Sequence, residues 1–333
     1  MDTFGRNFRV SIFGESHGEA IGAVLDGVPP GINLNPCDFS EDIARRSPGA
    51  RGAAARGESG TVGTTARVEA DEPIILSGVL DGVTTGAPLT IIFKNSNTRS
   101  SDYQDFKAMP RPGHADYVAS VKWDGANDLR GGGHFSGRLT LPVVAAGVVA
   151  KKMLEGITFD AKLIEVGGCG NLHRWPEMLK ATAAEGDSLG GVVECVVNDL
   201  PAGLGEPFFD SVESLISHAI FSIPGVRGIE FGDGFKAARM KGSEHNDPFG
   251  QDGRPAKNGA GGVNGGITNG APLHFRVAFK PTASIARAQE TWNFEKEEMD
   301  TLEIKGRHDV CFALRTPVIV EAMTAIVLAD LLK

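Results

Sequence analysis

Residues 14–18, GESHG, and the segments on either side of them decide which class of fold the sequence encodes. GESHG matches G-x-S-x-G, the nucleophile elbow of serine hydrolases, in which a strand runs into a sharp turn and then a helix. FRVSIF, residues 8–13, alternates apolar with polar residues and predicts a strand. In GEAIGAVLDGVPPG, residues 18–31, glycines and a Val-Leu pair favour a second strand. A loop between two strands is not a nucleophile elbow, so the hydrolase interpretation is not favoured.

Composition narrows the class of protein. The 333-residue chain has a formal net charge of −9 and a pI near 5.4, which argues against general nucleic-acid binding because too few Lys and Arg remain to neutralise phosphates. Its four cysteines show neither zinc-ligand nor C-x-x-C spacing, which favours a reduced, cytoplasmic protein. No apolar stretch is long enough to span a membrane. No linker divides the sequence, so we expect one continuous domain over residues 1–333.

Patterns typical of helices and of strands are both present throughout the chain. DFSEDIARR, residues 38–46, predicts a short helix with Asp38 as N-cap and Glu41 completing a capping box. The Gly- and Ala-rich residues 49–71 predict a flexible loop leading into a strand, and two apolar runs in 74–95 predict a hairpin. Three further helices are predicted at residues 139–154, 210–223 and 317–333.

A weak internal similarity suggests a duplication. LDGVPPGI, residues 25–32, resembles VVNDLPAGL in residues 196–204, and a helix pattern follows each. A repeated unit of a strand pair plus a helix would give two similar layers. Two unrelated turns from a strand into proline explain the same similarity, so the sequence leaves both interpretations open.

Four short stretches combine a histidine with glycine and with Arg, Asp or Ser. They are GESHG (14–18), RPGHADY (111–117), RGGGHFSGR (130–138) and KGRHDVC (305–311). A single loop histidine is more often a capping or solvent-facing residue, but four in such settings favour acid-base chemistry.

Arginines gather in the same glycine-rich parts of the chain. In an acidic protein this clustering predicts a local site for a multiply anionic small molecule, although some of the arginines could cap helix ends or pair with surface acids, Arg45 and Arg138 especially. The set comprises Arg45, Arg46, Arg111, Arg130, Arg138, Arg307 and Arg315. KNGAGGVNGGITNG, residues 257–270, fits neither G-x-G-x-x-G nor the P-loop, which excludes a Rossmann or NTPase assignment. Its glycines would let the backbone approach a flat ring or a phosphate.

Taken in order, these stretches resemble the chorismate synthase family, and the similarity extends nearly from end to end. The resemblance implies an α+β fold, a β-α-β sandwich with helices packed between antiparallel sheets, assembled as a homotetramer. It implies a lyase of the shikimate pathway that forms chorismate from 5-enolpyruvylshikimate 3-phosphate by anti-1,4-elimination of phosphate, with reduced FMN as an obligatory cofactor. The motifs that carry it include GESHG, RRSPG, ILSGVLDGVTTGAP, RPGHADY, RGGGHFSGR, GVRGIEFGDGF, GGITNG, KPTASI, GRHDVC and PVIVEAM.

The family's catalytic residues map onto five positions of this chain. By the resemblance, His17 donates a proton to the departing phosphate, and His114 protonates or stabilises the reduced flavin. Asp309 is the acid placed to handle the ring proton of the flavin. Ser16 and Ser136 match serines that assist this proton traffic, which makes Ser16 a relay hydroxyl rather than a nucleophile.

The family's binding residues form a larger set. Arg46 and Arg51 fall where members of the family contact NADP or an anionic substrate. Many members read RGGGRSSAR where this chain reads RGGGHFSGR, so His134 and Phe135 replace Arg and Ser at a flavin-contact turn. The flavin contacts map onto His134, Phe135, Ser136, Pro224, Gly225, Gly265, Lys280, Pro281, Thr282, Ala283, Ser284 and Arg307.

The expected partners are the substrate, the flavin and further copies of the chain, with no metal, nucleic acid or membrane. No inserted reductase-like segment is visible in the sequence, so we expect NADPH to act only as an indirect reductant through an external system. The alternative function is a catalytically silent flavin- or phosphate-binding protein of the same fold. Loss of His17, His114 or Asp309 would have indicated that alternative, and all three are present.

Overall fold

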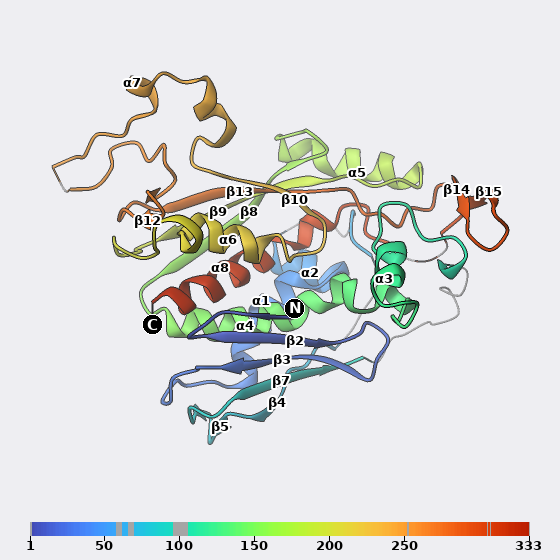
Figure 1. Ribbon diagram of the computed structural model, residues 1–333, viewed down its shortest axis with the longest axis horizontal. Helices are drawn as coiled ribbons and strands as arrows, with labels where there is room; N and C mark the ends of the chain where they lie inside the picture. Colours follow the sequence, from blue (N-terminus) through green and yellow to red (C-terminus); the bar gives the residue numbers. More distant parts are fainter. Residues whose placement is uncertain are drawn as a thin grey trace.

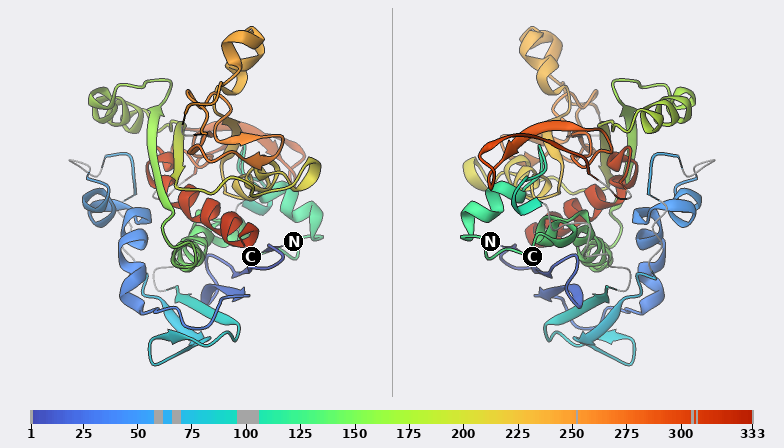
Figure 2. Two further views of the ribbon diagram at one scale, coloured as in Figure 1. Left: turned by 90° about the vertical axis from the view of Figure 1, so that its left-hand side faces the viewer. Right: turned by 90° about the vertical axis from the view of Figure 1, so that its right-hand side faces the viewer.

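The computed structural model describes residues 2–57, 62–65, 70–95, 106–251, 253–304, 306 and 308–332. Two antiparallel sheets enclose a layer of helices, as Figures 1 and 2 show from three sides. The first sheet has the order β1 (Thr3–Phe4), β2 (Arg9–Gly14), β3 (Ala20–Asp26), β7 (Leu89–Lys94) and β4 (Ile74–Ser77). The second has the order β8 (Thr158–Val166), β9 (Gly191–Asn198), β13 (Leu273–Phe279) and β10 (Val226–Phe231). The predicted α+β sandwich is confirmed.

Alternating side chains explain why these segments form sheets with one buried face. Along β9, Val193, Cys195 and Val197 are buried while the residues between them are partly exposed. Because successive side chains of a strand point to opposite faces, this alternation directs one apolar face toward the helices. The predicted hairpin within 74–95 is present, since β4 pairs antiparallel with β7.

Two long helices fill the space between the sheets. α4 (Thr140–Met153) is buried at every residue up to Ala150, and α8 (Pro317–Leu331) is buried from Val318 to Asp330. A helix that is apolar on all sides is stable only when it is covered on all sides. The two helices approach closely at Gly147, where an added Cβ atom would lie 2.3 Å from the Cβ of Ala322. The helices predicted at 139–154 and 317–333 are confirmed, as is α6 (Val212–Ile220) within 210–223.

The chain contains an internal structural repeat, in which two halves share one arrangement of strands. In both sheets the four main strands lie in the order first, second, fourth, third along the chain, namely β2-β3-β7-β4 and β8-β9-β13-β10. A two-stranded ribbon precedes the fourth strand in each half. The first ribbon pairs β5 (Val79–Leu80) with β6 (Val83–Thr84), and the second pairs β11 (Val263–Asn264) with β12 (Ile267–Thr268).

The turns that suggested a duplication are equivalent in detail. The Thr84 hydroxyl donates to Pro29 O (2.6 Å) and accepts from Ile32 N (2.9 Å). The Thr268 hydroxyl donates to Pro201 O (2.7 Å) and accepts from Leu204 N (2.9 Å). Two unrelated turns would not share this pattern together with the strand order, so the duplication is confirmed.

Two local predictions were wrong. Asp38 is not an N-cap, because it lies inside a 3-10 turn, Pro36–Phe39, that precedes α1 (Ser40–Arg46), and its carboxylate accepts from Asn35 N at 2.7 Å. The start of the predicted loop 49–71 is a helix, α2 (Gly49–Ala55). Alanine has the highest helix propensity of any residue, and its run here outweighs the two glycines.

The remaining elements lie at the edges of the sandwich. They are α3 (Asp116–Lys122), α5 (Trp175–Ala184), α7 (Gly242–His245) and the ribbon of β14 (Gln289–Asn293) with β15 (Glu298–Leu302). Among the residues described, no helix has the length and apolar character that crossing a membrane requires.

Candidate active site

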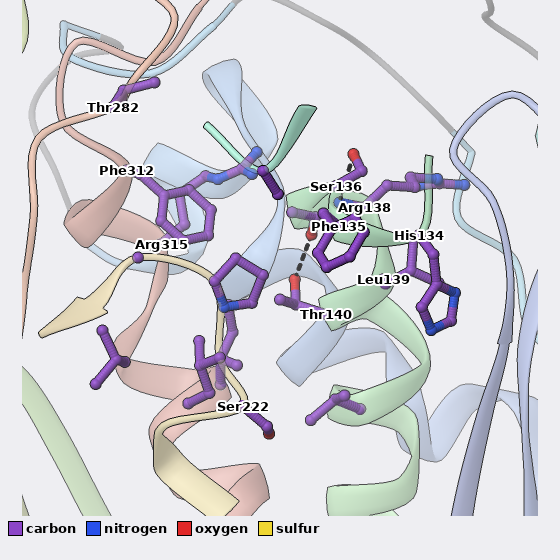
Figure 3. A pocket seen from close by; sticks show the side chains of 18 of the residues that line it. His134, Phe135, Ser136, Arg138, Leu139, Thr140, Ser222, Thr282, Phe312 and Arg315 are labelled. Carbon is purple, nitrogen blue, oxygen red and sulfur yellow. Dashed lines mark hydrogen bonds between the residues drawn. The ribbon is translucent and has the colours of Figure 1, made fainter. Parts of the chain in front are cut away.

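A cavity of about 1030 Å³ lies where the first turns of α4 and α8 come together. Figure 3 shows one wall formed by the turn from His134 to Thr140, with Phe312 and Arg315 on the α8 side and Ser222 below. Strand β2 and the loop between α6 and β10 complete the wall. Both halves of the repeat therefore contribute to one cavity.

Two buried arginines form a cationic end of this cavity. Arg46 donates from Nε to Thr140 Oγ1 (3.0 Å) and from Nη2 to Gly137 O (2.9 Å). Arg138 pairs with the Asp71 carboxylate and donates from Nε to Asn95 Oδ1 (3.1 Å). Burial opposes the ionisation of Asp71, but the charges of Arg138 and Arg46 outweigh it and hold the pKa of that carboxyl below its ordinary value. Two fixed cations facing one cavity suit an anionic ligand.

His114 lies in the cavity wall beside a buried ion pair. Its Nδ1 lies 2.7 Å from Asp116 Oδ1, and Arg111 grips the same carboxylate from Nε (2.7 Å) and Nη2 (2.8 Å). Burial disfavours the charged carboxylate, yet the hydrogen bonds from Arg111 and His114 hold the pKa of Asp116 well below its ordinary value. Asp116 is therefore a permanent anion beneath the imidazole.

His17 and Ser16 lie behind the glycine turn that forms part of the cavity wall. Gly131 lines the cavity, and a Cβ added to it would lie 2.6 Å from His17 Cδ2 and 2.7 Å from Ser16 Oγ. The backbone N–H of Ser16 donates to Gly133 O at 3.1 Å. This hydrogen bond holds the turn of residues 14–18 against the turn of residues 130–138, which contains Ser136.

Asp309 lies at the α8 side of the cavity. Its Oδ1 accepts from Thr65 N at 2.8 Å, and its Oδ2 lies 3.5 Å from Arg315 Nη2. These contacts fix the carboxylate in the wall of the cavity. Ser136 also lines the cavity, and its hydroxyl accepts from Arg138 N at 3.3 Å.

The run 280–284 supplies the groups that would hold a flavin. Burial and the neighbouring Arg227 lower the pKa of Lys280, so two cationic side chains lie close together at this part of the wall. Thr282 Oγ1 and Arg315 Nε are buried yet have no hydrogen-bond partner in the protein. Buried polar atoms are ordinarily paired, so these two are suited to a ligand rich in acceptors. The cavity residues fit FMN by size, charge and hydrogen-bonding capacity.

The structure brings together most of the predicted binding residues. Three of them do not line the cavity or cannot be placed. Gly265 lies in the turn of the β11–β12 ribbon, and Arg51 lies on α2 with Nη1 donating to Ala70 O at 3.1 Å. Arg307 lies outside the described residues. Those that line the cavity are Arg46, His134, Phe135, Ser136, Pro224, Gly225, Lys280, Pro281, Thr282, Ala283 and Ser284.

The glycines of 257–270 have a structural explanation. Gly261 lies against the backbone of Gly232 and His274, and Gly266 lies against Glu206 O, at distances that leave no room for a Cβ. Close approach of backbone to backbone therefore accounts for these glycines. The assignment of Gly265 to flavin binding stays a prediction.

Sequence reasoning missed several residues of the site. The sequence motifs do not single out Asp71, Asp116 or Arg227. Arg138, one of the predicted anion-binding arginines, does line the cavity, and it also pairs with a buried acid, Asp71. Arg45 does pair with acids, but the prediction of a surface acid was wrong for Glu321, which is buried and lies 2.6 Å away. The spacing of His114 and Asp116 within RPGHAD is a signal that could have identified Asp116.

Comparison with known proteins gives one consistent result. The family model described as chorismate synthase matches residues 8–332. Chorismate synthase of Chitinophaga pinensis is 56% identical over 332 residues, which are 99% of this chain and 96% of the relative. Chorismate synthase of Korarchaeum cryptofilum is 47% identical, with 99% of this chain and 96% of the relative covered.

The fold agrees with a solved structure described as a crystal structure of chorismate synthase. The TM-score is 0.72 at 27% sequence identity, and the match covers 99% of this chain and 92% of that one. The resemblance that the sequence motifs suggested is confirmed, and a silent binding protein is not favoured. The chain therefore belongs to the chorismate synthase family, whose members are flavin-dependent lyases that act on a small-molecule substrate in aromatic amino acid biosynthesis.

Proposed function

We propose that this cavity converts 5-enolpyruvylshikimate 3-phosphate to chorismate by anti-1,4-elimination of phosphate, with reduced FMN bound beside the substrate. The proposal rests on one observation: the cavity is lined by Arg46, Arg138, His114 and Asp309. The same cavity is lined by Thr282 and Arg315, whose Oγ1 and Nε atoms are buried without a hydrogen-bond partner in the protein. The arginines would bind an anionic substrate, and the buried donors would bind a cofactor rich in hydrogen-bond acceptors.

The arginine end of the cavity would hold the phosphate. Arg46 and Arg138 are fixed by hydrogen bonds to the start of α4 and to Asn95, so they need little reorganisation to receive an anion. His17 would protonate the departing phosphate, which leaves more easily as its charge is neutralised. Ser16, buried beside His17, would relay that proton.

The opposite side would hold the cofactor. Lys280 and Arg227 would bind its phosphate, while Thr282 and Ser284 would orient it. A reduced flavin, when bound, lends electron density to the substrate without net oxidation. His114 and Asp309 would hold and move protons at the flavin ring, with Ser136 assisting.

The sequence and its family resemblance also support proposals about the compartment, the oligomeric state and the reductant. We propose that it acts in the cytoplasm as a homotetramer and takes reduced FMN from an external reductant, with NADPH as an indirect source only. Arg51 would help to attract anionic ligands, since its charge already contributes to the lowered pKa of Asp71.

An anaerobic assay tests the function. Purified protein, 5-enolpyruvylshikimate 3-phosphate and dithionite-reduced FMN should give chorismate and phosphate in equal amounts, and omission of the reductant should abolish both. A change in the flavin spectrum on substrate addition without either product would instead indicate a silent binding protein.

Two substitutions test the proposed roles. His17→Ala and His114→Ala should each lower kcat by about 10²-fold or more, the usual contribution of a general acid or base. His173→Ala, at an exposed position outside the cavity, is the matched control and should leave kcat unchanged. Equal activity of all three variants would exclude both histidines from the chemistry.

A further inference from the structure

Beneath His114, the structure contains a buried ion pair to which the comparisons assign no role. The Asp116 side chain is only 2% exposed and Arg111 only 5%. Besides the two contacts from its guanidinium, Arg111 donates from its backbone N to Asp116 Oδ2 at 3.1 Å. A buried bidentate pair of this kind holds both side chains in one geometry.

Arg111 extends this pair toward the flavin-binding run. Its Nη1 donates to Ser284 Oγ at 3.1 Å, and its guanidinium lies over the Phe106 ring, 4.7 Å from the centroid. One rigid group therefore connects the carboxylate under His114 with the end of the run 280–284. The positions of the imidazole and of that run are fixed relative to each other.

The donor and acceptor chemistry determines which nitrogen of His114 carries the hydrogen. An ionised carboxylate only accepts and a guanidinium only donates. Asp116 Oδ1 lies 2.7 Å from His114 Nδ1, and Arg111 Nη2 lies 3.1 Å from the same nitrogen. The carboxylate is the nearer of the two, and Arg111 Nη2 already donates to Asp116 Oδ1 at 2.8 Å, so the geometry favours a hydrogen on Nδ1 that bonds the carboxylate. The neutral ring then has its lone pair on Nε2. That atom lies 3.3 Å from the position of a Cβ added to Gly132, so it faces the turn of residues 131–133, in which Gly131 lines the cavity as His114 itself does.

We propose that Asp116 is a positioning residue that fixes His114 as the Nδ1–H tautomer, with Nε2 presented to the cavity, and that Arg111 aligns this pair with Ser284. Asp116 itself is not among the residues that line the cavity. The inference rests on the proposed role of His114 only for its effect on catalysis, because the tautomer is a property of the protein alone.

The first test needs neither substrate nor cofactor. Nitrogen-15 NMR of the wild-type protein, recorded above the pH range in which histidines ordinarily titrate, distinguishes the two neutral tautomers of His114. We expect Nδ1–H. A ring found as Nε2–H in the wild type would overturn the proposal, whatever any variant does.

The second test changes the carboxylate. The amide of Asp116→Asn can donate to Nδ1, which would favour the Nε2–H tautomer and remove the lone pair from the cavity. We expect the NMR signals to report this exchange and kcat to fall by about 10²-fold, with KM for the substrate changed less than threefold. An Asp116→Asn protein that retains the Nδ1–H tautomer or its full kcat would contradict the proposal.

A matched ion pair controls for nonspecific loss of stability. Asp210 accepts two hydrogen bonds from Arg6, at 2.9 and 3.1 Å, on the surface. Asp210→Asn should leave both kcat and the His114 tautomer unchanged. If the wild type shows the expected tautomer but forms no chorismate, the proposed function fails while the positioning role of Asp116 stands. If chorismate forms and the tautomer is Nε2–H, the reverse holds.

Discussion

Three consecutive glycines, 131–133, adopt left-handed backbone conformations with φ values of 62°, 84° and 53°. Residues with a Cβ rarely adopt this conformation, and at Gly131 and Gly132 the missing Cβ also leaves space for His17 and His114. The turn passes against both imidazoles, so its backbone is a common support for the two proposed proton carriers.

Gly131→Ala should therefore reduce catalysis more than stability. The new methyl would lie 2.6 Å from His17 Cδ2 and would displace the ring, and a shift of about 1 Å in a reacting group can lower kcat by roughly 10²-fold. Gly156→Ala is a matched control, because Gly156 has φ +83° but open space around its Cβ position. The melting temperature should fall by a similar amount in both variants, whereas kcat should fall only in Gly131→Ala. Equal kcat in both would show that His17 does not depend on this turn.

Thr282→Val removes a buried hydroxyl that has no partner in the protein. If that hydroxyl binds the flavin, the loss of about 1 kcal/mol from one hydrogen bond raises the dissociation constant for FMN roughly fivefold. Quenching of flavin fluorescence measures it. Thr158→Val, at an exposed position, should bind as the wild type does. Unchanged or tighter binding by Thr282→Val would remove Thr282 from the flavin contacts.

Some site residues could be identified from sequence and others could not. His17, His114 and Asp309 lie in short local motifs, so their positions follow from the sequence resemblance alone. Asp71 acquires its role by pairing with Arg138, 67 residues away, and nothing in the residues around Asp71 indicates that partner. Only the tertiary fold brings the two together.

At the scale of elements, a buried charge network joins three helices. Glu321 of α8 pairs with Arg45 of α1 (2.6 Å) and with Lys151 of α4 (2.8 Å), and it accepts from Ala161 N of β8 at 3.1 Å. Burial opposes the charge on Glu321, but Arg45 and Lys151 hold the pKa of the carboxyl below its ordinary value. The network fixes how α1, α4 and α8 lie together behind the cavity.

Glu321→Gln should lower the free energy of unfolding by about 1–3 kcal/mol, because Arg45 and Lys151 lose one of the two carboxylates that they share and keep only Asp42, at 3.1 and 2.9 Å. Chemical denaturation at neutral pH measures this loss. Asp300→Asn breaks an exposed pair with Lys296 and should have little effect. A Glu321→Gln variant as stable as the wild type would show that the network is dispensable.

The same carboxyl predicts an acid-dependent stability. Its pKa is lower in the folded than in the unfolded protein, so its contribution is complete above the unfolded value of about 4.3 and is lost as the pH falls through the lower folded value. The free energy of unfolding of Glu321→Gln should depend less on pH in that acidic range. A pH dependence identical to that of the wild type would assign the acid sensitivity to other groups.

The helices α4 and α8 were predictable because both segments are long and mostly apolar. α2 was not, because its sequence, GARGAAA, combines two glycines with four alanines, and the two residue types have opposite helix propensities. Strand order was also beyond the local pattern, since β3 pairs with β7 rather than with the nearer β4. Which strands pair depends on the tertiary structure, because the apolar face of each sheet must be covered by the helices between the sheets.

At the scale of the whole molecule, the two halves repeat one design but form a single asymmetric cavity. The equivalent Thr84 and Thr268 are each buried, and each closes its turn through two hydrogen bonds. The cavity, in contrast, takes His114 from the first half and Asp309 from the second. The duplication supplies the scaffold, and the chemistry depends on differences between the halves.

Thr84→Val and Thr268→Val should destabilise the protein similarly, by about 1–3 kcal/mol each, because each removes two partly buried hydrogen bonds. The two sites lie in different halves and share no contact, so the double variant should show the sum of the two losses to within about 0.5 kcal/mol. Urea denaturation measures all three. Thr85→Val, at the exposed neighbouring position, is the control. A loss at only one site would show that the turns are equivalent in geometry but not in energy.

The position of the cavity between the two halves has a consequence for the lifetime of the protein. A small molecule bound in this cavity contacts both α4 and α8. It therefore stabilises the contact between the two halves of the repeat, because separating the halves would release it. At a concentration one hundred times its dissociation constant, such a molecule adds about 2.7 kcal/mol to the folded state. Resistance to heat and to proteases should therefore rise and fall with the supply of substrate and flavin in the cell.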